Sequence, residues 1–343
     1  MIKKALFLII CFCLLSPLIA QDTELVLKMA FPDPDSMIPD DYLVHPYDLV
    51  IFDGFFIVSD AQDSCLKVFS KSGEFIRKIG KSGQGPGEMN TVFRITINSQ
   101  NGIIFCNDQG NGRISSFDIS GEYKGMIKTF IPPRDIEYID GIIHTSVYNR
   151  VKKSLFSMYD SAGVLIKTYG EIFDNNIPEN RFSSSLYQRV NLDSDKNHFY
   201  VLYSYIPFIG IYSHKGELIR RLSIDVKEIK ESYKENIKGA KQGLVNGRLL
   251  MIFPWTKGGC VNDNQFYYLT NFEINEVLVL DSNGKFQKKI PFKNRGSNPS
   301  LRLITLSNKE YIFIDLDTAQ VKIYEEVTPP QSICPINCHS ENP

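Results

Sequence analysis

The chain has 343 residues, with 38 Lys and Arg against 39 Asp and Glu, so its formal net charge is −1 at pH 7. This balance gives no reason to expect nucleic-acid binding, which needs a basic surface. The length suits one domain with a large core, and no segment beyond the first 20 residues is apolar enough to span a membrane.

The first 20 residues are typical of a secretory signal peptide. Lys3 and Lys4 precede an almost wholly apolar run at 5–18, and Ala20 is a small residue at a suitable cleavage point. Cys11 and Cys13 lack the small-residue context of a lipoprotein signal. We therefore expect a soluble protein exported to the periplasm or the extracellular space, and favour it over a lipid-anchored one.

A repeat anchored on glycine follows. Large apolar residues stand four and seven positions before each anchor and two and six positions after it; the anchors are Gly73, Gly121, Gly163, Gly216 and Gly284. The positions two and six after the glycine share one face of a strand, because side chains alternate with period 2. Each copy thus predicts a hairpin whose glycine occupies a turn position with positive φ.

A second hairpin is predicted upstream of each copy. Its later strand is rich in β-formers, as in FFIVSD from Phe55 and IIFCND from Ile103, and turn dipeptides such as Asp53-Gly54 precede it. Two hairpins per unit make a four-stranded antiparallel sheet. In the sixth unit the strand YIFIDL from Tyr311 is followed by VKIYEE from Val321, and the last strand is lacking. The run Glu24–Phe31 can supply that strand. We predict an all-β, six-bladed β-propeller over 21–327, closed by the N-terminal strand, in preference to a β-sandwich.

The stretch VFSKSGEFIRKIGKSGQGPGE (68–88) resembles bacterial exported six-bladed β-propellers related to NHL-repeat proteins. The resemblance covers essentially the whole mature chain. It implies the propeller fold and export. It implies little about activity, since most such proteins have none assigned.

Three further segments are distinctive. Residues 171–188 are polar and loop-like, whereas 226–241 has helical spacing of apolar residues and predicts an amphipathic helix that covers the surface or binds a partner. The tail 328–343 contains Cys334 and Cys338, for which a disulfide or free thiols are favoured over a metal or haem site. Cys65 and Cys106 are expected to be buried.

Candidate ligand-binding residues lie in segments that a propeller gathers at the top of its channel. The predicted starts of four inner strands carry Arg94, Arg134, Arg189 and Arg302, with Arg248 a weaker candidate for blade five. Blade one instead has His45, Tyr47 and Asp48, and the glycine-rich connector 81–88 supplies Gln84, Gly85 and Glu88. Converging arginines could bind a carboxylate, phosphate or sulfate; alternatively each is neutralised by Asp or Glu or solvated, and the connector is simply a tight turn.

No pattern indicates catalysis. The five histidines are not expected to meet, no zinc, calcium or nucleophile motif is complete, and no cofactor is expected. We therefore favour a monomeric binding or protein-interaction module. Its partner could be a small molecule, a glycan, a peptide or another exported protein, with an anionic ligand as one candidate. A hydrolase or lyase of the lactonase or amidating-lyase type, acting in the same channel, is the alternative.

Overall fold

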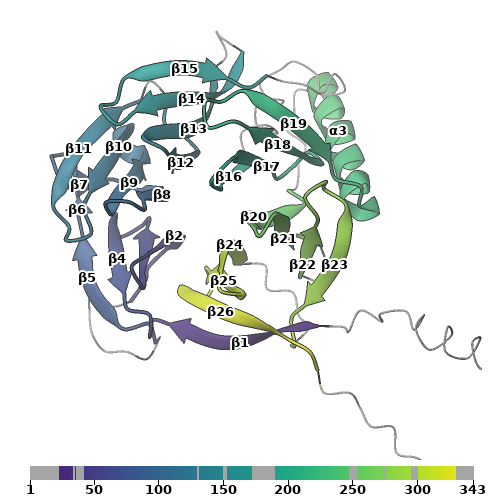
Figure 1. Cartoon of the computed structure of the whole chain (residues 1–343), viewed down its shortest axis with the longest axis horizontal. Helices are drawn as coiled ribbons and strands as arrows, with labels where there is room; N and C mark the ends of the chain where they lie inside the picture. Colours follow the sequence, from purple (N-terminus) through teal and green to yellow (C-terminus); the bar gives the residue numbers. More distant parts are fainter. Residues whose placement is uncertain are drawn as a thin grey trace, which may run out of the picture.

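The computed structural model describes residues 23–33, 35, 42–129, 131–149, 153–171, 190–246, 254–272, 275–294 and 300–329. In these residues, six four-stranded antiparallel sheets surround a central axis (Figure 1). The predicted all-β six-bladed propeller is confirmed. The predicted signal peptide, positions 172–188 of the predicted loop and positions 330–343 of the tail lie outside the described residues.

Each of the first five blades uses four consecutive main strands, with the first strand innermost. Blades one to three comprise β2 Pro46–Phe52, β3 Phe55–Asp60, β4 Cys65–Phe69 and β5 Phe75–Ile79; β8 Val92–Asn98, β9 Ile103–Asp108, β10 Arg113–Phe117 and β11 Tyr123–Lys128; and β12 Asp135–Ile139, β13 Ile142–Asn149, β14 Ser154–Asp160 and β15 Leu165–Tyr169. Blades four and five comprise β16 Val190–Ser194, β17 Phe199–Tyr203, β18 Phe208–Tyr212 and β19 Leu218–Ser223; and β20 Thr256–Asn262, β21 Gln265–Thr270, β22 Glu276–Leu280 and β23 Phe286–Pro291.

Blade six is completed by the N-terminal strand, as predicted. It contains β24 Leu301–Ser307, β25 Glu310–Asp315 and β26 Gln320–Val327, and its outer strand is β1 Glu24–Phe31. β1 runs antiparallel to β26, with Glu24 opposite Val327 and Phe31 opposite Val321. This pairing covers the backbone edge of β26, which would otherwise be open to another chain.

The turn glycines adopt the predicted left-handed conformation. The five repeat anchors have φ between 70° and 98°. At four of the tight inner hairpins both turn residues have positive φ, for example Asp53 and Gly54 at 48° and 78°, and Asp140 and Gly141 at 48° and 84°. Such turns match the right-handed twist of the strands they join, so the local sequence fixes the hairpin register.

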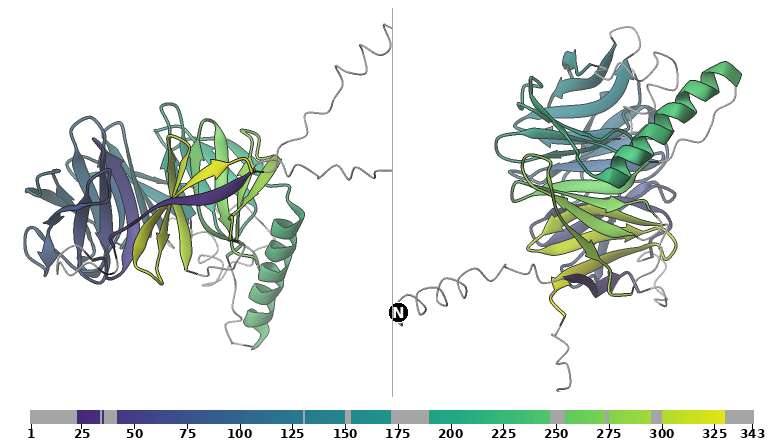
Figure 2. Two further views of the ribbon diagram at one scale, coloured as in Figure 1. Left: turned by 90° about the horizontal axis from the view of Figure 1, so that it is seen from below. Right: turned by 90° about the vertical axis from the view of Figure 1, so that its right-hand side faces the viewer.

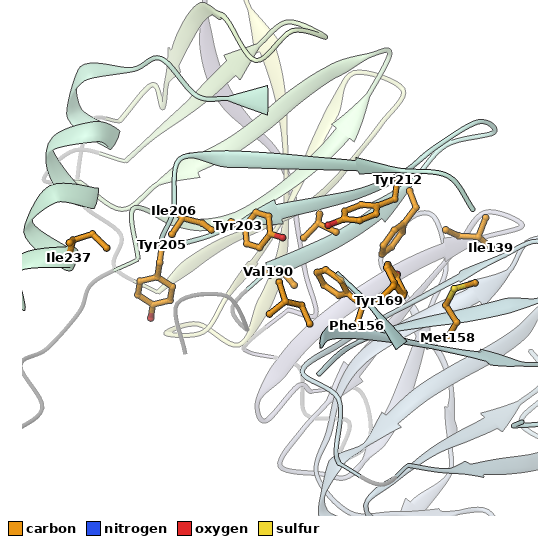
Figure 3. Packing of buried hydrophobic residues seen from close by; sticks show 13 residues of the cluster. Ile139, Phe156, Met158, Tyr169, Val190, Tyr203, Tyr205, Ile206, Tyr212 and Ile237 are labelled. Atoms are coloured by element: carbon orange, nitrogen blue, oxygen red, sulfur yellow. The ribbon is translucent and has the colours of Figure 1, made fainter. Parts of the chain in front are cut away.

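A helix follows blade four. α3 spans Lys227–Asn246, so it begins where the sequence predicts and runs past the predicted end at 241. It rises from one face of the ring (Figure 2). Ile229 and Ile237 are buried, and Ile237 packs with Tyr205 and Ile206 of the loop between β17 and β18 (Figure 3). The apolar side of the helix therefore covers the core, as its spacing of apolar residues implies.

The blades are held together by apolar clusters between neighbouring sheets. One cluster joins blades three and four through Phe156, Tyr169 and Val190 (Figure 3). Cys65 and Cys106 are buried and unbridged, as expected, and Cys260 is a third buried free thiol among the described residues. No helix in the described ranges has both the length and the apolar character needed to cross a bilayer.

Candidate functional site: a charged channel along the propeller axis

The inner strands bring together residues that are far apart in the sequence. β2, β8, β12, β16, β20 and β24 follow one another around the axis (Figure 1). Residues at the starts of these strands line one end of the channel, and residues nearer their ends line the other. We call these spaces the upper cavity and the lower cavity.

The upper cavity has a volume of about 350 Å³. Its charged lining consists of four cations, with no carboxylate among the described residues: Arg94, Arg134, Lys257 and Arg302. The rest of its wall is formed by Tyr47, Val190, Asn191, Ser204, Pro254, Thr256, Gly258, Ser300, Leu301 and Leu316. Three of the four predicted arginines thus meet at one cavity.

Arg94 lies between the two cavities and contributes to the lining of both. Its guanidinium lies 3.3 Å from both Asp48 Oδ1 and Asp135 Oδ1 and donates a 2.8 Å hydrogen bond to Asn191 Oδ1. These partners come from blades one, three and four, so Arg94 reaches across the axis. Burial raises the pKa of Asp135 to about 6, because it outweighs the opposing effect of the Arg94 charge. The alternative reading, in which an arginine is neutralised by protein carboxylates, therefore holds for Arg94.

Arg302 has a different environment. Its Nη1 donates to the backbone oxygen of Tyr47 at 3.1 Å, and the guanidinium lies over the Tyr47 ring, 4.4 Å from the centroid. No carboxylate forms an ion pair with Arg302 within the described part of the chain. Burial and then the nearby Arg94 lower the pKa of Arg302. Among the described residues, its charge is thus only partly compensated.

Tyr47 contributes an aromatic wall between cations. Its ring packs 4.5 Å from that of Phe93, and Arg94 lies 5.8 Å from its centroid on the side of the second blade. Burial by itself raises the pKa of the phenol, but the charges of Arg302 and Arg94 outweigh burial and lower that pKa below its usual value. The ring therefore stabilises both guanidinium groups through their positions over its face.

The remaining two cations, Arg134 and Lys257, have different surroundings. Arg134 is exposed, its backbone N–H donates to Ser146 O, and its side chain has no ion pair in the ranges that the structure describes. Lys257 Nζ donates to Asn275 Oδ1 at 3.2 Å, and burial lowers the pKa of its ammonium. The Arg134 guanidinium can therefore offer donors to a ligand, and both side chains bring a cation to the cavity wall.

The lower cavity has the opposite charge. It measures about 320 Å³, and its acidic lining is Asp48, Asp135, Glu137 and Asp193, with Arg94 as the cation on its wall. Ser194 Oγ donates to Glu137 Oε1 at 2.7 Å, and burial followed by the charge of Asp193 raises the pKa of Glu137 well above its usual value. Burial also raises the pKa of Asp193 to about 6. The channel is therefore cationic at one end and acidic at the other.

Other predicted site residues lie elsewhere. His45 belongs to the segment before β2, where its backbone N–H donates to Asp60 Oδ1 at 2.9 Å. Gln84, Gly85 and Glu88 belong to the connector between blades one and two, around β6 Lys81–Ser82 and β7 Glu88–Met89 at the outer edge of the ring (Figure 1). None of the four lines the upper cavity. Their contact with a ligand stays a prediction, and Arg189 lies outside the described residues.

The connector has a structural explanation of its own. Glu88 Oε2 accepts the backbone N–H groups of Gln84 and Gly85, at 3.0 and 2.9 Å. The guanidinium of Arg113 donates to the backbone oxygens of Gln84, Gly85 and Glu88 and pairs with Asp108. The backbone N–H and C=O groups of the connector thus have hydrogen-bond partners within the protein, which favours a tight turn over a ligand-binding loop.

Sequence reasoning missed two residues of the site. Asn191 lies two positions after Arg189, and the alternation of side chains could have placed it on the axis. Lys257 was missed because blade five was expected to begin near Arg248; β20 instead begins at Thr256, after α3, and Arg248 lies outside the described residues. The long insertion hid the start of this strand.

Histidines and cysteines do not form a metal centre in the part of the chain that the structure describes. The His144 ring stacks on Phe199, and its Nδ1 lies 2.7 Å from Tyr169 Oη. His214 is near enough to influence the pKa of His144, so these two histidines lie closer together than the sequence suggested. Asp195 closes the first hairpin turn of blade four by accepting the backbone N–H groups of Asn197 and His198.

Comparisons with known proteins agree with this architecture. A family model described as "6-bladed beta-propeller" matches residues 39–242. The chain is similar in structure to a presumed exported protein of Bacteroides fragilis (TM-score 0.61, 12% identity, covering 92% of this chain and 98% of that one). It is also similar to virginiamycin B lyase from Staphylococcus aureus (TM-score 0.53, 12% identity, 89% and 100%). At such identities the likeness shows the fold alone, and no curated protein matches the sequence.

Proposed function

The chain belongs to the 6-bladed beta-propeller family, and from this premise we propose that it is an exported binding propeller whose upper cavity holds a small anionic ligand. The binding role is favoured over the hydrolase or lyase alternative because the cationic side chains of the upper cavity are arranged to bind a negatively charged ligand. The ligand could be a free small molecule or an acidic group of a glycan, a peptide or another exported protein.

The observation that supports the proposal is the charge of the upper cavity. Four cationic side chains face about 350 Å³ of space, and the carboxylates that neutralise Arg94 lie on the side of the lower cavity. Charge-assisted hydrogen bonds from guanidinium groups to an anion are about twice as strong as neutral ones. An anion in this cavity would relieve the repulsion among the cations, and the volume suits a small molecule.

Calorimetric titration of the purified protein from residue 21 onward tests the proposal. The probes are inorganic phosphate, sulfate and small carboxylates, each at low and moderate salt. We expect saturable binding that weakens with salt, because screening reduces charge attraction. Arg302→Met should weaken binding about tenfold or more, since it removes a charge-assisted donor.

The matched control is Arg220→Met. Arg220 lies on β19 at the outside of the ring and donates to Asn283 and Ser282. It should leave binding unchanged, while a thermal melt verifies that both variants fold. Absence of binding to every probe, or equal losses in the two variants, would contradict the proposal.

Export is the second part of the proposal. It is supported by the N-terminal run at 1–20 and is in keeping with the exported neighbour from Bacteroides fragilis. Expression of the full chain in a bacterium, followed by fractionation and N-terminal sequencing, should find a chain beginning near residue 21 outside the cytoplasm. A full-length chain retained in the cytoplasm would contradict export.

A further inference from the structure

The four cations of the upper cavity are unevenly distributed around the ring. Arg94 and Arg134 come from the second and third blades, whereas Lys257 and Arg302 come from the fifth and sixth. The first and fourth blades contribute neutral side chains to the upper wall, among them Tyr47 and Val190. In a ring of six blades the first and fourth are opposite (Figure 1), so two cationic sides face each other across the axis.

The two sides differ in how much positive charge remains available. On one side, Arg94 already pairs with Asp48 and Asp135, which leaves Arg134 as the cation without an ion pair in the described part of the chain. On the other side stand Arg302 and Lys257. Arg302 uses one of its five N–H donors on Tyr47 O, and no described carboxylate pairs with it.

Among the residues that the structure describes, the wall between the two sides is apolar or uncharged. It is formed by the Tyr47 ring from blade one and by Val190 from blade four, with Asn191 and Ser204 of blade four as neutral polar groups. A ligand that spans the cavity therefore has cations near both of its ends and uncharged residues beside its middle. A single small anion would neutralise only one side and leave the other unpaired.

We propose that the ligand of the upper cavity is a small dianion with two acidic groups at opposite ends of a short uncharged spacer. This inference rests on the proposed function and specifies the ligand class for the same site. One acidic group lies with Arg134, and the other with Arg302 and Lys257. Once the first group is bound, the second binds at a high effective concentration, which favours a dianion whose length matches the span.

The experiment is calorimetric titration with α,ω-dicarboxylates of increasing chain length, each compared with the monocarboxylate of equal chain length. We expect one dicarboxylate to bind about tenfold or more tightly than its monocarboxylate, with weaker binding by shorter and longer members. Arg134→Met should remove this advantage, so that the dicarboxylate binds no more tightly than its monocarboxylate. Arg302→Met should weaken both compounds, and Arg220→Met should weaken neither.

The outcomes separate this inference from the function on which it rests. If monocarboxylates and dicarboxylates bind equally well at every length, or if Arg134→Met spares the dicarboxylate advantage, the dianion inference is overturned and anion binding stands. If no carboxylate, phosphate or sulfate binds at all, both are overturned. Because Arg134 is exposed and its side chain makes no ion pair among the described residues, its replacement is expected to leave the fold intact.

Discussion

At the scale of single residues, the channel contains several buried ionisable side chains. Glu137 accepts hydrogen bonds from Ser194 and Thr96 inside the lower cavity, and burial together with Asp193 raises its pKa. The native state therefore keeps a proton on Glu137 at pH values where the unfolded chain has lost it. The contribution of this group to stability is fully present below the unfolded pKa and is lost as pH rises through the folded pKa.

Glu137→Gln should therefore stabilise the protein at alkaline pH. The amide imitates the protonated acid, and both hydroxyl partners can donate or accept. At about pH 8 we expect the free energy of unfolding to exceed that of the parent by ~1 kcal/mol or more, because each pH unit above the unfolded pKa contributes about 1.4 kcal/mol until the folded pKa is reached. The gain should shrink toward zero near pH 4.

Urea titrations at about pH 4.5, 6 and 8 measure this difference. Glu217→Gln, an exposed carboxylate in the turn between β18 and β19, is the control and should show no such trend. The comparison of variant with parent at each pH cancels the opposing contribution of His144, whose pKa burial lowers to about 4. A Glu137→Gln variant that is less stable than the parent at pH 8 would contradict the interpretation.

At the scale of elements, the outer hairpin of each of the first five blades depends on one glycine. Gly73 has φ of 84°, and a Cβ there would lie 2.8 Å from Phe31 Cβ; Gly121 has φ of 98°, and its nearest neighbour would be Ile79 at 3.5 Å. Any side chain would therefore strain the backbone at both positions, and at Gly73 it would also clash with Phe31. The contact with Phe31 also means that the turn of blade one packs directly against β1.

Gly73→Val and Gly121→Val should both destabilise the fold by more than ~1 kcal/mol, because a β-branched residue is strained at positive φ. Gly73→Val should be the more damaging, since Phe31 must also move. Denaturant titration gives both values. Lys71→Val, at an exposed position of the same turn, is the control; midpoints that do not differ from those of the control would show that these turns tolerate side chains.

At the scale of the whole molecule, β1 links three blades. Leu25 packs in the cluster of blades five and six, and Phe31 lies 5.1 and 5.2 Å from the rings of Phe56 and Phe69 in blade one. Because β1 is also the outer strand of blade six, ring closure depends on a segment far in sequence from its partner β26.

Deletion of Glu24–Phe31 should therefore destabilise the entire ring. The loss of two fully buried apolar side chains alone corresponds to roughly 3–6 kcal/mol, and the freed edge of β26 invites association with a second chain. Denaturant titration and size-exclusion chromatography measure the two effects. A chain that begins at Thr23 is the control; a deletion variant that unfolds like this control and stays monomeric would contradict the role of β1.

The sequence determined the fold because the signals were local and repeated. Period-2 alternation and a left-handed glycine turn in each copy specify the hairpins, and counting them specifies six blades with one strand missing. The same repeat placed Arg94, Arg134 and Arg302 at equivalent strand entries, and the structure brings all three to one cavity.

The tertiary structure decided how those charges are used. Arg94 is neutralised by Asp48 and Asp135, which neighbouring blades supply, whereas Arg302 lies against Tyr47 and Arg134 has no ion pair within the described ranges. Lys257 joins the cavity only because β20 begins after a long helical insertion that interrupts the repeat. Charge compensation depends on distances across the axis, and no pattern within a single strand records those distances.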